Sequence, residues 1–197
     1  MKSFAALTLS IWLISMAIST VAQPAVLDIG GQPVESGVQY YVMPAVADIA
    51  SDLTLINRNN NSCPLYVGQE PIRRRTSVPG LPVIFKPFAE GETIIRESRD
   101  LTVTFQASIA CAESSGWRVG EEDPETGSRF IVSGGEADYF AIQNDGFYNF
   151  VWCPTESCPT CDRPRCGTAG ILSENGKRLL ALDTPAAAAF PFLFARA

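Results

Sequence analysis

The sequence contains no histidine. Histidine supplies the general base of Ser–His–Asp and Cys–His catalytic sites, and it is the commonest metal ligand among side chains. Its absence therefore excludes both kinds of catalytic site, together with any metal centre built on imidazole groups. Carboxylate chemistry stays open, but no motif points to it. We expect a protein that is not an enzyme and that uses neither a cofactor nor a metal.

Positive charge is also scarce. The chain has 15 Lys and Arg against 21 Asp and Glu, a formal net charge of −6. Nucleic-acid binding needs dense Lys and Arg, so no nucleic-acid partner is expected. The one dense basic cluster is Arg73-Arg74-Arg75. It could meet an acidic partner or a trypsin-like enzyme, but a solvated loop is the simpler interpretation.

Long apolar runs are almost absent as well. The only one, Phe4 to Ala17, follows Lys2 and precedes the small residues Ser19 to Ala22. This pattern is typical of a secretory signal peptide, and the run is shorter than the ~20 residues that span a bilayer. We predict a signal peptide over 1–22 and one domain over 23–197. The mature chain would not contact a membrane and would be secreted or vacuolar.

Helical periodicity is hard to find, whereas short alternating or β-branched runs are frequent and are separated by turn clusters such as Gly134-Gly135. This pattern predicts an all-β barrel or sandwich, and the strands alone do not separate the two. The twelve expected strands are Gln39–Met43, Leu53–Ile56, Leu65–Val67, Val83–Phe85, Thr93–Arg96, Leu101–Phe105, Trp117–Val119, Arg129–Val132, Tyr139–Ile142, Tyr148–Trp152, Gly170–Leu172 and Leu179–Leu182.

Six cysteines in a secreted chain indicate three disulfides, for which 15 pairings are possible. Two cysteines stand apart and four lie in one short segment; in order they are Cys63, Cys111, Cys153, Cys158, Cys161 and Cys166. Zinc is the alternative for the four clustered thiols, because Cys158-Pro-Thr-Cys161 has the spacing of two thiolate ligands. An oxidising compartment favours disulfides.

The segment after the predicted signal peptide carries the most specific motif. Val26-Leu-Asp-Ile-Gly-Gly-Gln-Pro-Val34, followed by Tyr40-Tyr-Val42, resembles the opening signature of the plant Kunitz-type (soybean trypsin inhibitor) family. Gly30 departs from it, because the family usually has a polar residue there. The residues that fit are Val26, Asp28, Gly31, Gln32, Val34, Tyr40 and Val42.

Later motifs extend the resemblance over nearly the whole mature chain. They are Cys63-Pro-Leu65, Gly80-Leu-Pro-Val-Ile-Phe85, Ser115-Gly-Trp-Arg-Val119, Tyr139-Phe-Ala-Ile142, Tyr148-Asn-Phe-Val-Trp-Cys-Pro154, Cys166-Gly-Thr-Ala-Gly-Ile171 and Lys177-Arg-Leu-Leu-Ala-Leu182. The resemblance implies a β-trefoil of twelve strands in three similar units. The aromatic residues Trp117, Tyr148, Trp152 and Phe190–Phe194 are expected to pack in the core or the barrel cap rather than bind a ligand.

The cysteine clustering is similar to that of the miraculin-like branch of this family. That resemblance implies the pairs Cys63–Cys111, Cys153–Cys166 and Cys158–Cys161. In the loop-entropy model the first bridge contributes ~4 kcal/mol and the second ~3 kcal/mol to the free energy of unfolding.

The family resemblance also implies a function: inhibition of an endopeptidase, with serine proteases as the default target, by a rigid substrate-like loop. Preorganisation makes such a loop effective, because little entropy is lost on binding. The loop is expected between two predicted strands, at Lys86-Pro87-Phe88-Ala89-Glu90-Gly91-Glu92. Its only basic residue is Lys86, which precedes a proline, so trypsin is a poor candidate. Alignment by flanking motifs puts the specificity position near Glu90-Gly91, whereas a shifted loop would offer Phe88 to a chymotrypsin-like pocket.

Other positions complete the sequence-based expectations. Ser36 occupies the place of an Asn that braces the loop in potent family members, and it is shorter with one donor. Asn60-Asn-Ser62 is an N-glycosylation acceptor. The acidic run Glu121–Glu125 lacks EF-hand spacing and is expected to be a solvated loop.

The inhibitor is expected to be a monomer. The rival hypothesis is a non-inhibitory, miraculin-like storage or defence protein on the same scaffold.

Overall fold

A computed structural model describes residues 22–46, 50–59, 63–71, 80–111, 113–160, 166–183 and 190–197. Within these ranges no helix is long and apolar enough to cross a membrane. Several predicted features lie outside them: the signal peptide up to residue 21, the acceptor Asn60, the cluster Arg73–Arg75, and Cys161.

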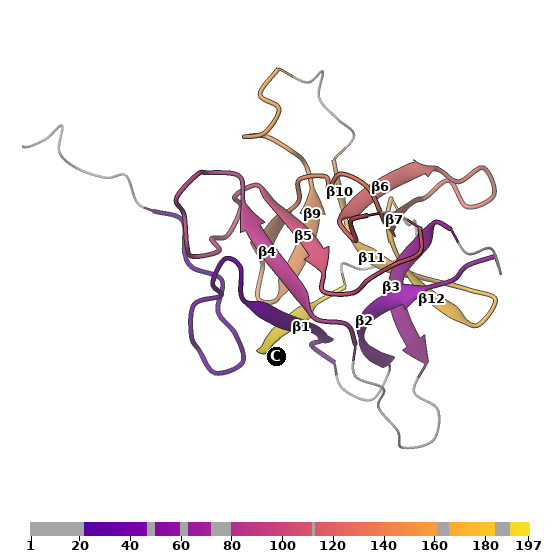
Figure 1. Ribbon diagram of the computed structural model, residues 1–197, viewed down its shortest axis with the longest axis horizontal. Coiled ribbons are helices and arrows are strands. Elements are labelled where there is room, and N and C mark those ends of the chain that lie inside the picture. The colour runs from indigo at the N-terminus through magenta and orange to yellow at the C-terminus, as the bar shows by residue number, and fades with distance from the viewer. Residues whose placement is uncertain are drawn as a thin grey trace, which may run out of the picture.

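Six strands close into a barrel (Figure 1). They are β1 (Gln39–Pro44), β4 (Val83–Pro87), β5 (Leu101–Phe105), β8 (Ala141–Asn144), β9 (Tyr148–Trp152) and β13 (Phe192–Arg196). Antiparallel pairing runs from β13 through β1 and β4 to β5, and from β8 through β9 back to β13. A bridge between Leu101 and Phe140 joins β5 to the residue before β8 and completes the ring.

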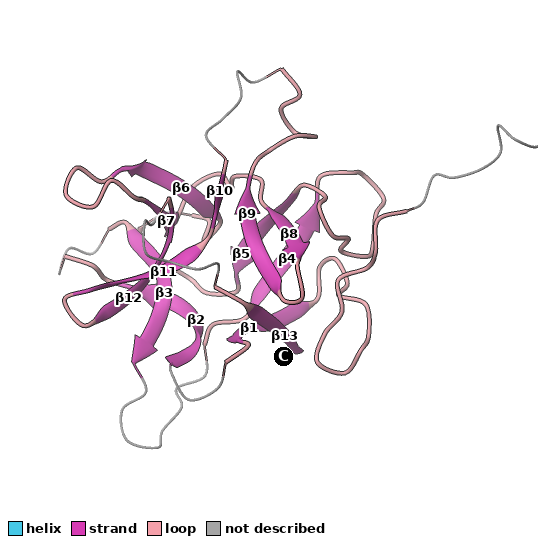
Figure 2. Ribbon diagram, turned by 180° about the vertical axis from the view of Figure 1, so that it is seen from behind, coloured by secondary structure: helices cyan, strands magenta, loops and turns pink. Residues whose placement is uncertain are grey.

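Three hairpins cover one end of this barrel (Figure 2). They are β2 (Ala50–Ile56) with β3 (Leu65–Pro71), β6 (Trp117–Glu122) with β7 (Arg129–Ser133), and β11 (Gly170–Glu174) with β12 (Lys177–Leu182). The second strands β3, β7 and β12 all pair with one another. Two barrel strands and one hairpin therefore recur three times, and the predicted β-trefoil is confirmed. A short strand, β10 (Gly167–Thr168), is added beside β9.

Two of the strand predictions are wrong. Residues 93–96 form only isolated bridges, Ile94 with Glu35 and Arg96 with Ala25, because the N-terminal segment beside them supplies no continuous ladder. The twelfth main strand is instead β13, whose residues are expected from the sequence only to pack in the core or the barrel cap. Its run of Phe, Leu and Phe after Pro191 lacks the polar alternation that marks a half-buried strand. Phe192 and Phe194 are fully buried, as expected for core residues.

Aromatic rings fill the core. Phe85, Phe105, Trp117, Phe140, Phe150, Phe192 and Phe194 are at most 1% exposed. All but Phe140, which lies just before β8, come from strands of the barrel or the hairpin cap, because alternate residues of a strand face inward, as in the pattern of β5. The barrel and the hairpins consequently share one main core.

Two disulfides cross-link connecting segments outside the core. Cys63 pairs with Cys111 and Cys153 with Cys166, at Cα separations of 5.3 and 4.7 Å. These are two of the pairs that the family resemblance implies. Cys158 is disulfide-bonded too, and its expected partner lies outside the described residues. The zinc alternative for the four clustered cysteines is therefore wrong.

Arg58 holds the ends of the three hairpins together. Its side chain, 8% exposed, donates to Asp123 at 2.6 Å and to Glu174 at 2.8 Å. The guanidinium also lies 4.2 Å from the ring centroid of Phe130. The acidic run is not wholly the expected solvated loop: Glu121 and Glu122 are exposed but belong to β6, Glu125 is exposed in the turn, and Asp123 is engaged in this ion pair.

The Arg58–Asp123 pair predicts a loss of stability in acid. Hydrogen bonding to Arg58 lowers the pKa of Asp123 from 3.8 to about 2. A carboxylate whose pKa is lower in the folded state stabilises the fold above its unfolded pKa. The pKa shift of Asp123 is worth about 2 kcal/mol in the free energy of unfolding. This contribution should be lost as the pH falls from 4 to 2. Urea unfolding from pH 6 to pH 2 measures this, and Asp123→Asn should flatten the pH dependence; an unchanged slope would contradict it.

Candidate functional site

The exposed loop between β4 and β5 begins at Phe88, two residues later than predicted. Lys86 and Pro87 belong to β4, where they pair with Thr102 and Leu101 of β5. Pro87 is tolerated because β1 pairs only with the first two residues of β4, so this end of the strand has one neighbour. The apex of the predicted loop is thus Phe88–Glu92.

Phe88 is both exposed and anchored. Its side chain is 41% exposed, and its ring meets Tyr139 edge to face, with centroids 5.2 Å apart. Its backbone N–H donates to the carbonyl oxygen of Asp100 at 2.8 Å. Packing on the barrel and presentation to solvent therefore occur together at this residue.

A tight turn follows Phe88. The N–H of Glu92 donates to the carbonyl oxygen of Ala89 at 3.4 Å, and Gly91 has a φ of 78°. A positive φ at the third position is the signature of a type II turn, which favours glycine there. Glu90 and Gly91 are exposed at the turn, whereas the carboxylate of Glu92 pairs with Arg96 at 2.9 Å.

Ser36, the expected brace, lies at the base of the loop. Its N–H donates to the carbonyl oxygen of Thr93 at 2.8 Å, and its hydroxyl donates to that of Phe85 at 3.4 Å. Both bonds hold the chain just outside Phe88–Glu92. Ser36 therefore fixes the two ends of the loop, while Arg96 and Tyr139 hold its apex.

A cavity of about 530 Å³ lies between the loop and the barrel. Thr102 and Tyr139 line it from the barrel, and Lys86 is the only basic residue among its lining residues. The loop is consequently supported at defined points rather than packed along its whole length. In the described ranges, no group of three or more Cys, Asp or Glu is placed to hold a metal ion.

Sequence reasoning missed three residues that hold the loop: Arg96, Asp100 and Tyr139. An acidic and a basic residue four positions apart, such as Glu92 and Arg96, indicate an ion pair only when both lie on a helix. The sequence predicts no helix here. Asp100 contacts Phe88 from the residue before β5, and Tyr139 does so from the region before β8, so only the tertiary fold brings them together.

Comparison with known proteins places this geometry in context. A family model described as "Trypsin and protease inhibitor" matches residues 26–196. The chain is 41% identical over 184 residues to a Kunitz type trypsin inhibitor of Medicago truncatula, covering 88% of each chain. It is 32% identical over 219 residues to miraculin of Synsepalum dulcificum, covering 96% of this chain and 97% of miraculin. Among solved structures, a Kunitz type trypsin inhibitor of Cicer arietinum superposes with a TM-score of 0.73 at 28% identity, covering 88% of this chain and 98% of that one.

Proposed function

The chain belongs to the Kunitz-type family of trypsin and protease inhibitors, and on that premise we propose that it inhibits a serine endopeptidase through the loop Phe88–Glu92. Members of this family are protease inhibitors and not enzymes. The β-trefoil supplies the rigid support that a substrate-like loop needs, because preorganisation lowers the entropy lost on binding.

The observation that carries the proposal is the exposed Phe88 directly after β4. An extended peptide can bind a partner by strand-like backbone pairing, with alternate side chains in pockets. Lys86 and Pro87 are already extended, so the backbone on the N-terminal side of Phe88 has the required shape. Moving the Phe88 ring from Tyr139 into a pocket costs only about 0.5–1.5 kcal/mol, the value of an aromatic pair. Burial of the ring in the protease would offset that cost.

Charge disfavours trypsin as the target. The segment Phe88–Glu92 has two carboxylates and no basic side chain. Lys86 lies in β4 and precedes Pro87, whose fixed φ and missing N–H make a poor scissile bond. Glu90-Gly91, the other candidate position, lies in a tight turn rather than in extended backbone. We therefore propose a chymotrypsin-like protease, whose primary pocket accepts a large apolar side chain.

An inhibition panel tests this function. Disulfide-intact protein is titrated against chymotrypsin, subtilisin, trypsin and papain, with cleavage of a small chromogenic peptide as the readout. We expect chymotrypsin to be inhibited at least about 100-fold more tightly than trypsin, a difference of about 3 kcal/mol in binding free energy. No inhibition of any of the four at micromolar concentration would contradict the proposal and favour the non-inhibitory, miraculin-like alternative.

A further inference from the structure

The loop Phe88–Glu92 is too small to form a complete protease interface. Protease–inhibitor complexes typically bury about 800 Å² per partner and involve roughly 20–30 residues on each side. A five-residue loop supplies only part of such a surface. A bound protease must therefore also touch neighbouring segments, and the hydrogen bonds of Asp100 show which segment lies beside the loop.

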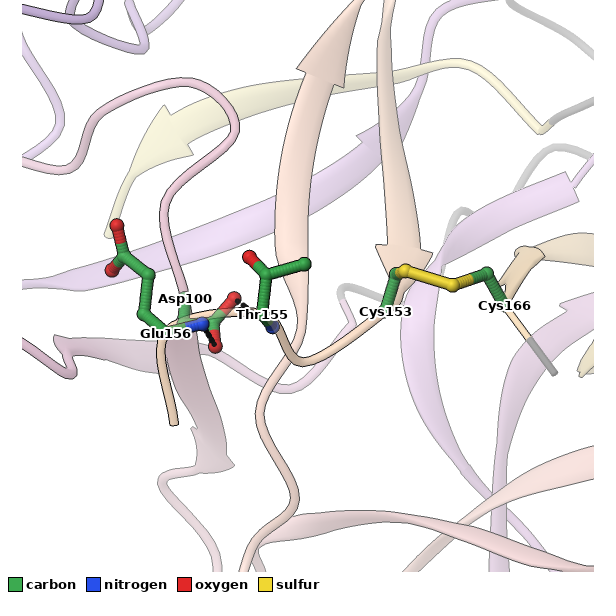
Figure 3. The surroundings of a disulfide bond; sticks show 5 residues. All are labelled: Asp100, Cys153, Thr155, Glu156 and Cys166. Carbon is green, nitrogen blue, oxygen red and sulfur yellow. Dashed lines mark hydrogen bonds between the residues drawn. A yellow bond between two sulfur atoms is a disulfide. The ribbon is translucent and has the colours of Figure 1, made fainter. Parts of the chain in front are cut away.

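Asp100 bonds two chain segments at once. Its carbonyl oxygen accepts the N–H of Phe88 at 2.8 Å. Its carboxylate accepts the N–H of Glu156 at 2.9 Å and, more weakly, the N–H of Thr155 at 3.5 Å (Figure 3). It also accepts the N–H of Ser157 at 2.8 Å and the Ser157 hydroxyl at 2.9 Å. The whole residue is 1% exposed. Charge-assisted hydrogen bonds are about twice as strong as neutral ones, so this contact is firmly held.

Two further links fix the same segment. The disulfide Cys153–Cys166 anchors its start to the chain beside β9 and β10 (Figure 3). Arg99 forms an ion pair with Glu156. With the backbone fixed in this way, Thr155, Pro159 and Thr160 remain exposed to solvent. The residues Thr155–Thr160, which we call the disulfide segment, therefore form an exposed surface whose first half Asp100 links to the loop.

We propose that the disulfide segment is a second contact surface for the protease that binds Phe88–Glu92, and that Asp100 is the positioning residue that sets the two surfaces relative to each other. This inference rests on the proposed function. Because the segment is already ordered through Asp100, it adds contact area without the entropic cost of ordering a flexible loop. Asp100 itself is buried and touches no target; it acts through the backbone groups that it holds.

Bulky substitutions in the disulfide segment test the contact directly. Thr155→Arg and Thr160→Arg are compared with Ser173→Arg, a matched change at an exposed position of β11 in the hairpin cap. Association and dissociation rates with chymotrypsin are measured by progress curves, and melting temperatures verify folding. We expect Thr155→Arg and Thr160→Arg to raise the inhibition constant for chymotrypsin tenfold or more. Ser173→Arg should leave it within about twofold of the unchanged protein's value.

A double-mutant cycle tests the role of Asp100. Asp100→Asn should raise the dissociation rate, and adding Thr155→Arg to it should have little further effect, because the segment is already misplaced. If Thr155→Arg, Thr160→Arg and Asp100→Asn all inhibit like the unchanged protein while Phe88→Ala does not, the second contact is overturned and the proposed function stands. If the unchanged protein inhibits none of the proteases, the proposed function fails and this inference fails with it. Additive effects of Asp100→Asn and Thr155→Arg would overturn the positioning role.

Discussion

Replacing Phe88 by alanine is expected to weaken inhibition of chymotrypsin by roughly 100-fold, about 3 kcal/mol of binding free energy. Few residues carry most of the binding energy of an interface, and buried aromatic anchors are prominent among them. Phe88 is the only aromatic residue of the loop, and it is exposed directly after extended backbone. Its removal would take the anchor from the primary pocket while the strand and turn stay in place.

The measurement is the inhibition constant against chymotrypsin for the unchanged protein and the variant. Phe147→Ala is the matched control, because Phe147 is 56% exposed and lies between β8 and β9. It should inhibit like the unchanged protein. If Phe88→Ala still inhibits fully and Glu90→Ala does not, the specificity position lies in the turn at Glu90-Gly91 instead.

Replacing Phe150 by alanine is expected to lower the free energy of unfolding by about 3–5 kcal/mol. Phe150 is fully buried, and its ring centroid lies 5.2 Å from that of Trp117 and 5.0 Å from that of Phe192. Its ring also approaches Phe85 and Phe194. These contacts join β9 to β4, β6 and β13, so a cavity there would loosen the barrel and the hairpin cap together.

Urea unfolding at neutral pH, with the disulfides intact, measures this loss. Phe88→Ala provides the comparison, because truncation of a partly exposed ring should cost far less. A loss below about 1 kcal/mol for Phe150→Ala would mean that the neighbouring rings collapse into the space.

The strands were predictable where local pattern and burial agree. The run Leu101–Phe105 alternates buried and half-buried residues, and both its predicted ends match β5. Tyr148–Trp152 likewise matches β9. The prediction failed where a neighbouring segment decided the outcome, since residues 93–96 have strand-like composition but no continuous partner. A strand exists only if another strand pairs with it, and a single sequence does not display that partner.

The sequence predicts the position of the loop, but not its exact start or the contacts that support it. The flanking motifs predict it at Lys86–Glu92, between Phe85 and Thr93, and the Lys86-Pro87 bond argues against trypsin from the sequence alone. Its actual start at Phe88 depends on the pairing of Lys86 and Pro87 with β5. The support from Tyr139 depends on a contact across the barrel.

By itself, then, the sequence determined the all-β class, the family and the absence of histidine-based catalysis. Composition, short-range spacing and signature residues carry that information, because they reflect local preferences and a shared scaffold. Only the tertiary structure decided that Asp100 joins the loop to the disulfide segment and that Arg58 joins the three hairpins. The physical reason is that a side-chain hydrogen bond depends on distance in space, and its donors and acceptors here lie tens of residues apart along the chain.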